Sequence, residues 1–351
     1  MLLVYFGILV LFILQPYTKQ RYTNIKSFCL IAFIYLVAIY ALRDLNYGDL
    51  IGYKNTYLKL PSESYLSIIS DWLSGESKDG GFYIFAKIFA DIGISAELWM
   101  HFIGALFAGA FCCFTYKKSK EPFLSIIILL VFYLSFTFTG LRQTMAMALI
   151  YIAYILMSEK KLAKFLICVL LASAFHSSAL IFIPAYWIYK MKVGWKNIFI
   201  PVIFLGIALI APDLFRNAIE FLAWNESLEG YADAEQTLSW AGYIIQLFIY
   251  AFCFIFRKST RIEDENEAVY IDGFFNCMMI GLCFQSFAVT VAEAFRMSYY
   301  FSMCSVCAVP NIIFYQKKKK DKKFLYYLVL VCLLAYMMWS RMYFGYTYFW
   351  E

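Results

Sequence analysis

The side chains of this chain that could do chemistry stand at the ends of apolar segments. Arginine guanidinium groups bind phosphate or carboxylate oxygens with two parallel hydrogen bonds. Histidine and carboxylate side chains can accept a proton from a reacting hydroxyl. The set consists of Arg43, Asp44, Asp49, Tyr53, Arg142, Gln143, His176, Ser177, Glu293, Arg296 and Tyr300. These residue types predict a site that binds an anion and moves a proton.

Arg142 has the most informative local context. Gly140 interrupts one apolar segment, and Arg142 and Gln143 open the next. A guanidinium at the start of a helix adds its charge to the positive end of the helix dipole, a combination that favours an anion. Arg142 is therefore a candidate anion ligand, together with Arg296 and Arg43.

Several residues are candidates for the proton acceptor, and the sequence does not rank them well. They are His176, Asp44, Asp49 and Glu293. An isolated histidine in a turn is more often a satisfied structural residue, and an arginine at a helix end is often an interfacial anchor or half of a local ion pair. The functional interpretation rests on the position of all these residues on the same side of a membrane.

The composition of the chain predicts that it lies in a membrane. The chain is 63% hydrophobic and only 15% charged, far from the quarter charged of a soluble domain. We expect an all-α, polytopic integral membrane protein that forms a single transmembrane domain, residues 1–351, with about twelve helices in a range of 10 to 13. The apolar segments are 1–15, 27–42, 97–115, 122–139, 143–157, 165–175, 178–190, 197–212, 239–256, 269–291, 297–315 and 324–340.

The positions of the basic residues predict on which side of the membrane each loop between these helices lies. Twenty-one of the 30 lysines and arginines fall in one set of alternate loops, including the run Lys317 to Lys320. The positive-inside rule places these loops in the cytoplasm and both termini outside. Five of the nine basic residues on the outer side are arginines, which suits recognition of an anion there.

With this orientation the outer face carries two long connections, residues 43–96 and 213–238, which we expect to form the catalytic face. The first contains an amphipathic stretch near residues 82–94 that begins and ends outside, so we expect a re-entrant or interfacial helix. The ten cysteines fall mostly in apolar segments, and no acidic cluster has metal-ligand spacing. We therefore expect no metal and no cofactor.

At these positions the sequence resembles the Wzy/EpsG class of bacterial polysaccharide polymerases. The matching strings are Arg43, Asp44, Asp49 and Tyr53; Gly80 to Phe82; Gly140 to Gln143; Ala172 to Pro184; and Arg296 with Tyr300 and Phe301. The resemblance covers most of the chain in order. One departure is Asp79, where a Glu-Pro pair is more typical of the class. The resemblance therefore implies no role for Asp79.

The resemblance implies a polymerase on the outer face of the cytoplasmic membrane. It would join undecaprenyl-diphosphate-linked oligosaccharide repeat units into O-antigen, capsular or exopolysaccharide chains by metal-independent glycosyl transfer. Arg142, Arg296 and Arg43 would bind diphosphate, and Gln143, Tyr53, Ser177 and Tyr300 would support the substrate. The partners would be the lipid-linked oligosaccharide and the bilayer, with a chain-length regulator and a flippase as further candidates. No feature indicates nucleic acid.

Three other functions compete with this one. A polysaccharide ligase would use the same donor and a different acceptor, and the sequence does not separate it cleanly. A flippase would need charged residues along a path through the bilayer, whereas the helix middles offer only neutral groups, Gln246, Asn276, Gln285 and Asn311. A membrane O-acyltransferase could use an outer histidine, but the arginine-rich outer rim suits diphosphate better.

Overall fold

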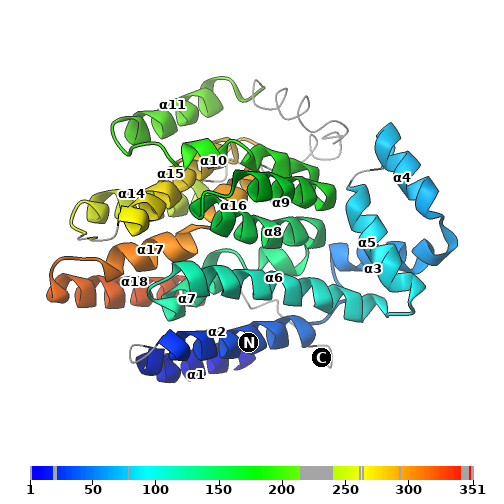
Figure 1. The fold of residues 1–351 in the computed structure, drawn as a ribbon, viewed down its shortest axis with the longest axis horizontal. Coiled ribbons are helices and arrows are strands. Elements are labelled where there is room, and N and C mark those ends of the chain that lie inside the picture. Colours follow the sequence, from blue (N-terminus) through cyan, green and yellow to red (C-terminus); the bar gives the residue numbers. More distant parts are fainter. Residues whose placement is uncertain are drawn as a thin grey trace.

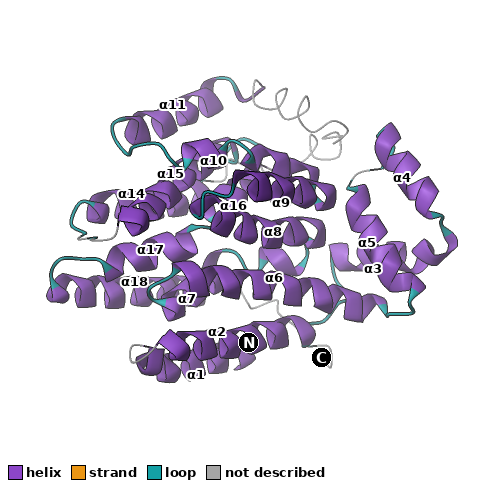
Figure 2. Ribbon diagram, in the orientation of Figure 1, coloured by secondary structure: helices purple, strands orange, loops and turns teal. Residues whose placement is uncertain are grey.

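The structure is a computed structural model, and it describes residues 2–18, 22–77, 79–213, 240–260, 262, 265–291, 294–340 and 348. Within these residues it is built of α-helices and short 3₁₀ turns, with two isolated β-bridges, Arg43 to Tyr348 and Thr260 to Gln316 (Figure 2). The predicted all-α class is confirmed.

The helices in chain order are α1 (Leu2–Thr18), α2 (Tyr22–Ala41), α3 (Asp49–Lys59), η1 (Leu60–Ser62), α4 (Tyr65–Ser74), α5 (Gly80–Asp91), α6 (Ala96–Lys118), α7 (Pro122–Phe132), η2 (Phe136–Phe138), α8 (Leu141–Ser158), α9 (Leu162–Phe175), η3 (Ser177–Phe182), α10 (Ala185–Ile188), α11 (Lys196–Ile210), α14 (Ala241–Arg257), α15 (Glu265–Phe287), α16 (Ala294–Ser302), α17 (Ser305–Phe314) and α18 (Lys319–Trp339).

Every predicted apolar segment overlaps an apolar helical segment of the structure. In the described residues six of these are long and apolar enough to cross a membrane, among them α6 and the combined α16 and α17, Ala294–Phe314. The others have 10 to 17 residues, such as α7 and α11. These helices support the prediction that the chain is a membrane protein. The number of spans and the outward position of the termini stay predictions.

Most helices lie side by side along the long axis of the molecule (Figure 1). α1 and α2 form the lowest layer in this view, and α11 forms the uppermost. α8 lies in the middle and packs against α6 and α9. Its side chains are buried on nearly every face, as a helix surrounded by other helices requires.

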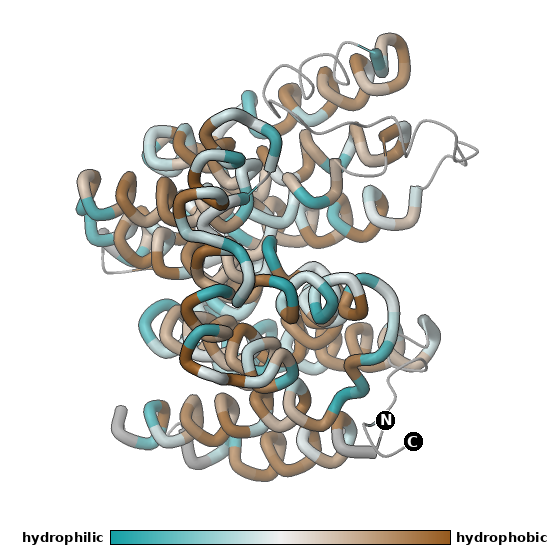
Figure 3. The backbone as a smooth tube through the Cα atoms, turned by 90° about the vertical axis from the view of Figure 1, so that its right-hand side faces the viewer, coloured by the Kyte–Doolittle hydropathy of each residue, from teal (hydrophilic) through white to brown (hydrophobic). Residues whose placement is uncertain are grey.

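α3, α4 and α5 form a small lobe beyond one end of the bundle, at the right of Figure 1. The lobe has its own core, in which the Tyr57 ring stacks on Trp99 of α6 at 4.9 Å between centroids. The buried Lys87 ammonium donates to the Leu60 carbonyl at 3.1 Å and to Asp91 at 2.9 Å, which joins α5 to η1. Figure 3 looks directly at this end, where hydrophilic residues recur along the nearest segments.

The predicted amphipathic stretch near residues 82–94 thus coincides with α5, inside the lobe. Whether this helix enters the bilayer stays a prediction. The residues 213–238 of the second outer connection lie outside the described part of the chain, except for Asp213.

Loops that the charge pattern assigned to one side do gather at one end of the bundle. Lys117 pairs with Glu159 at 3.5 Å, and Lys120 with Glu267. Lys322 lies 3.6 Å from Glu121. Because α6 has 23 residues, this end lies about 34 Å from the lobe. These basic loops and the lobe therefore lie at opposite ends of the bundle, and which end faces the cytoplasm stays a prediction.

Candidate functional site

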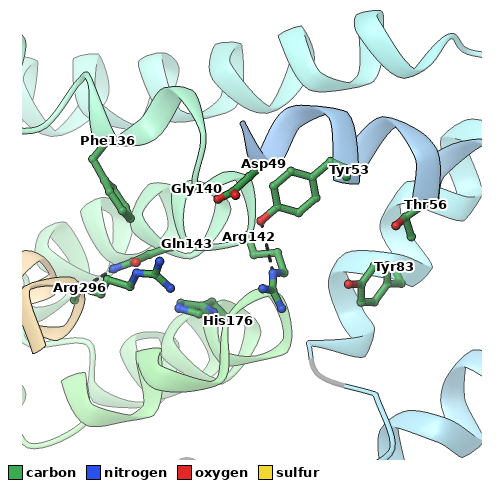
Figure 4. A pocket seen from close by; sticks show the side chains of 11 residues that line it. Asp49, Tyr53, Thr56, Tyr83, Phe136, Gly140, Arg142, Gln143, His176 and Arg296 are labelled. Carbon is green, nitrogen blue, oxygen red and sulfur yellow. Dashed lines mark hydrogen bonds between the residues drawn. The ribbon is translucent and has the colours of Figure 1, made fainter. Parts of the chain in front are cut away.

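A polar pocket of about 330 Å³ lies where the lobe meets the bundle. Its walls come from α3, α5, η2, the start of α8, the turn after α9 and the start of α16 (Figure 4). The lining residues are Asp49, Gly52, Tyr53, Thr56, Tyr83, Phe136, Gly140, Arg142, Gln143, His176 and Arg296. Of the predicted site residues, the structure brings six together here: Asp49, Tyr53, Arg142, Gln143, His176 and Arg296.

The buried carboxylate of Asp79 lies behind the pocket lining and contacts two of these residues, Arg142 and His176. Asp79 is 3% exposed, and its Oδ2 accepts from Arg142 Nη1 at 2.9 Å and lies 3.2 Å from His176 Nδ1. Its Oδ1 accepts the backbone N–H of Ser177 at 2.9 Å. Asp79 therefore joins the lobe to α8 and to the turn after α9.

The backbone of Asp79 explains how its side chain reaches that position. Asp79 immediately precedes α5 and has φ 53° and ψ 44°, the left-handed conformation. Such a conformation is uncommon outside glycine, although aspartate tolerates it better than most residues. The carboxylate does not cap α5 and is directed instead to Arg142 and His176. Strained backbone of this kind is characteristic of functional sites.

A close approach of α5 to the end of α9 completes the arrangement. A Cβ at Gly81 would lie 2.7 Å from both the Cβ and the carbonyl oxygen of Ala174, two residues before His176. No larger residue fits without movement of backbone, so Gly81 fixes the distance between Asp79 and His176.

We therefore expect Gly81→Ala to lower the free energy of unfolding by about 1–3 kcal/mol, because the new methyl group overpacks the contact. The matched control is Gly109→Ala on α6, where a Cβ would meet only Phe33 at an ordinary 3.6 Å. Thermal unfolding of both variants in detergent measures the difference. Equal melting temperatures would show that α5 does not need this close approach.

The charge of Asp79 determines which ring nitrogen of a neutral His176 carries the proton. Burial alone would raise the pKa of Asp79, but the hydrogen bond and charge of His176, the Arg142 guanidinium and the Ser177 N–H together lower it below the ordinary value of an aspartate. The carboxylate is therefore ionised at neutral pH and can only accept hydrogen bonds. A neutral His176 must then carry its proton on Nδ1, which leaves Nε2 as the basic nitrogen.

The two arginines of the pocket differ in how firmly they are held. Arg142 is fixed by Asp79 and by the Tyr53 hydroxyl, 3.4 Å from its Nε, and its side chain is 29% exposed. Arg296 is positioned through its backbone, whose carbonyl accepts from Gln143 Nε2 at 2.6 Å. Its buried Nε finds no hydrogen-bond acceptor within the described residues. In Figure 4 the two guanidinium groups lie on either side of His176.

Helix α3 supplies the far wall. It begins after Gly48, whose φ of 51° and ψ of −138° suit glycine, and it directs Asp49 and Tyr53 to the pocket. Asp49 is exposed. Among the described residues, its carboxylate is thus the acidic group that lies on the pocket surface itself, in contrast to the buried Asp79.

Arg43 and Asp44 lie outside the pocket lining. Arg43 is 1% exposed, donates to the Phe138 carbonyl at 2.5 Å, and places its guanidinium over the rings of Tyr40 and Phe138. Asp44 Oδ1 accepts from the backbone and side-chain nitrogens of Asn46, both at 3.0 Å. These contacts order the turn that leads from α2 to α3.

The remaining predicted residues lie near the site or outside the described residues. Ser177 contributes its backbone N–H to Asp79, and the buried Tyr300 hydroxyl lies 3.2 Å from Ser178 Oγ. Glu293 is not among the described residues. Among the residues that are described, no three His, Cys, Asp or Glu side chains are grouped so that they could hold a metal ion.

Sequence reasoning missed Asp79. Its position directly before Gly80 and Gly81, a pair of small residues that permits close helix contact, was the available signal. The departure from the Glu-Pro pair obscured it, although the residue there is still an acid.

Comparison with known proteins gives one match. The family model described as EpsG family matches residues 2–350. No curated protein and no solved structure matches the chain at a significant level.

Proposed function

Because the chain belongs to the EpsG family, which points to a polymerase of polysaccharide biosynthesis, we propose that it joins lipid-diphosphate-linked oligosaccharide repeat units into a polysaccharide. The substrate is an oligosaccharide on undecaprenyl diphosphate, and the site faces the outside of the cytoplasmic membrane. The observation that carries the proposal is the pocket in which Asp79 holds both Arg142 and His176.

In the proposed reaction a hydroxyl oxygen of the acceptor sugar attacks the anomeric carbon of the donor chain. The bond between that carbon and the diphosphate oxygen breaks, and its electron pair leaves with the lipid diphosphate. The proton of the hydroxyl passes to the base. The enzyme must therefore stabilise a departing anion and accept one proton.

Arg142 and Arg296 are the proposed ligands of the diphosphate. Both line the pocket, and guanidinium groups match phosphate oxygens bidentately. The ion pair with Asp79 holds Arg142 in place before the substrate arrives, so little ordering is required as charge develops on the leaving group. Arg43, buried against Phe138, would act on the pocket through the turn that contains it.

His176 is the proposed base. An ionised Asp79 orients its ring and stabilises the imidazolium that forms after proton transfer, the same division of labour as in the histidine–aspartate pair of serine proteases. Asp49 is the second candidate, because it is an exposed carboxylate on the same pocket. Asp44 and Glu293 remain predicted candidates. Gln143 and Tyr53 hold the arginines and thereby support the substrate.

A ligase with the same donor is the alternative function, since only the acceptor differs. A flippase would need a charged path between the ends of the bundle, whereas the arginines of this site gather at the end that carries the lobe. A chain-length regulator and a flippase are proposed partners of the polymerase, as the resemblance implies.

The test is the surface polysaccharide of a deletion strain. We expect the long-chain polysaccharide to disappear and units with a single repeat to remain, and the wild-type chain on a plasmid should restore the ladder. A ligase would instead leave polymer on its lipid carrier, and a flippase would leave the repeat units inside the cell. Either pattern contradicts the proposed polymerase.

A further inference from the structure

A second pocket lies beside the first and has the same volume, about 330 Å³. Its walls come from the end of α7 and the residues that follow it, the start of α14, the end of α15, the start of α16 and the end of α18. Its volume is within the range of small-ligand sites. The function proposed above assigns no role to it.

A single layer of aromatic rings separates the two pockets. Phe136 lines the first pocket, and its ring packs edge-on against Phe295 at 5.5 Å and Tyr299 at 5.2 Å, which line the second. α16 carries Arg296 to the first pocket and Phe295 and Tyr299 to the second. A ligand that occupied both pockets would therefore need to extend only past Phe136.

The chemistry of the second pocket differs from that of the first. Among the described residues, its lining combines aromatic rings, including Tyr133, Tyr299 and Tyr336, with the amides of Gln246 and Gln285, and contains no Asp, Glu, Lys, Arg or His. These lining residues offer no charge to match a diphosphate. Amides donate and accept hydrogen bonds, and aromatic faces pack against apolar C–H surface.

The two glutamines are built into a network that presents one amide to the pocket. Gln246 Nε2 donates to Gln285 Oε1 at 3.1 Å, and Gln246 Oε1 accepts from Ser298 Oγ at 3.0 Å. Gln285 is 6% exposed, and its Nε2 donates no hydrogen bond within the described residues. A Cβ at Gly242 would lie 2.6 Å from this nitrogen, so the glycine leaves room for the amide.

We propose that the second pocket binds a neutral sugar residue of the oligosaccharide substrate, adjacent to the residue that reacts in the first pocket. Sugar hydroxyl or acetamido oxygens accept from Gln285 Nε2, and the sugar ring packs on the tyrosine and phenylalanine rings. A polyprenyl chain fits less well, because it would cover the glutamine amide without offering it an acceptor. The assignment rests on the proposed polymerase function.

The test uses Gly242→Ala, whose methyl group displaces the Gln285 amide, and Gln285→Leu, which removes it. Gly206→Ala on α11 is the matched control, because a Cβ there meets nothing within 4 Å. Calorimetric titration of the purified full chain uses two probes: repeat-unit oligosaccharide from the strain's own polysaccharide, and sugar-free undecaprenyl diphosphate.

We expect the wild type and Gly206→Ala to bind the oligosaccharide, and Gly242→Ala and Gln285→Leu to bind it at least about tenfold more weakly, as loss of one or two hydrogen bonds predicts. Binding of undecaprenyl diphosphate should not change. Weakened binding of undecaprenyl diphosphate instead would assign the pocket to the lipid chain and overturn the proposal. Unchanged binding of the oligosaccharide, or none by the wild type, would also overturn it.

Failure of the polymerase function and failure of the sugar pocket give different experimental results. If the wild type binds the oligosaccharide through Gln285 but does not polymerise the lipid-linked unit, the polymerase function fails and the sugar pocket stands. If it polymerises the unit while Gly242→Ala binds oligosaccharide as the wild type does, the polymerase function stands and the sugar pocket fails.

Discussion

Replacement of Arg142 with alanine should slow polymer formation by about 10² to 10³-fold, the usual effect of removing one charge-assisted contact to a developing anion. Because the negative charge grows as lipid diphosphate departs, kcat should fall more than KM rises. The protein should remain inserted, since the Arg142 side chain is 29% exposed. Polysaccharide gels of cells with the variant should show single repeat units in place of a ladder.

Two further variants make this result specific. Arg142→Lys should restore activity only in part, because an ammonium keeps the charge and loses the bidentate fork. Lys54→Ala removes a cation in the same lobe, one paired with Glu97 at 2.6 Å and partly exposed, and should leave the ladder unchanged. Normal chain length in Arg142→Ala at normal expression would reduce Arg142 to an interfacial anchor.

Asp79→Asn should have an effect of about 10² to 10⁴-fold on kcat, because it disturbs both the base and the arginine. An asparagine amide can donate to His176 Nδ1, which would move the proton to Nε2 and block it as a base. Arg142 would lose its ion pair at 2.9 Å. Steady-state kinetics of the purified variant measures the loss, and Asp71→Asn on α4 is the control in the same lobe.

The pH range of this effect follows from the ionisation of Asp79. The pKa of Asp79 lies below its ordinary value in the folded protein, so its stabilising contacts are present at neutral pH and are lost only when the pH falls through that lowered pKa. A loss in Asp79→Asn should therefore appear at every neutral pH, because the wild-type carboxylate is ionised throughout that range. A wild-type-like rate at any neutral pH would remove Asp79 from the mechanism.

The elements that carry strong hydrophobic signals could be predicted from the sequence. α6 and α8 begin and end within a few residues of the predicted segments, since long apolar runs have few alternatives to a membrane helix. The helices of the lobe, α3 and α4, were not predicted. The core of α3 depends on a distant partner, since Tyr57 packs on Trp99, and such a contact leaves no periodic signal in a short polar segment. α4 does carry apolar residues at helical spacing, such as Tyr65, Ile68 and Trp72, but its ten residues are too few for a membrane span.

The grouping of the candidate residues could be predicted where helix ends determine it, and could not where burial determines it. Arg142, His176 and Arg296 could be grouped because each lies at a helix end of the same predicted side. Arg43 and Asp79 could not be placed, because the sequence does not show that one guanidinium is covered by Phe138 or that one carboxylate reaches behind His176. Burial of a polar group depends on tertiary contacts, which composition does not record.

The most direct measurement combines purified protein in vesicles with lipid-diphosphate-linked repeat units. Each new glycosidic bond should release one undecaprenyl diphosphate, counted by mass spectrometry beside the growing polymer ladder. A chelator should not change the rate, because the arginines are proposed to stabilise the leaving group without a metal. One lipid diphosphate per bond in the presence of chelator is the predicted result. Failure to form polymer, or a rate that the chelator abolishes and a divalent ion restores, would contradict the proposed mechanism.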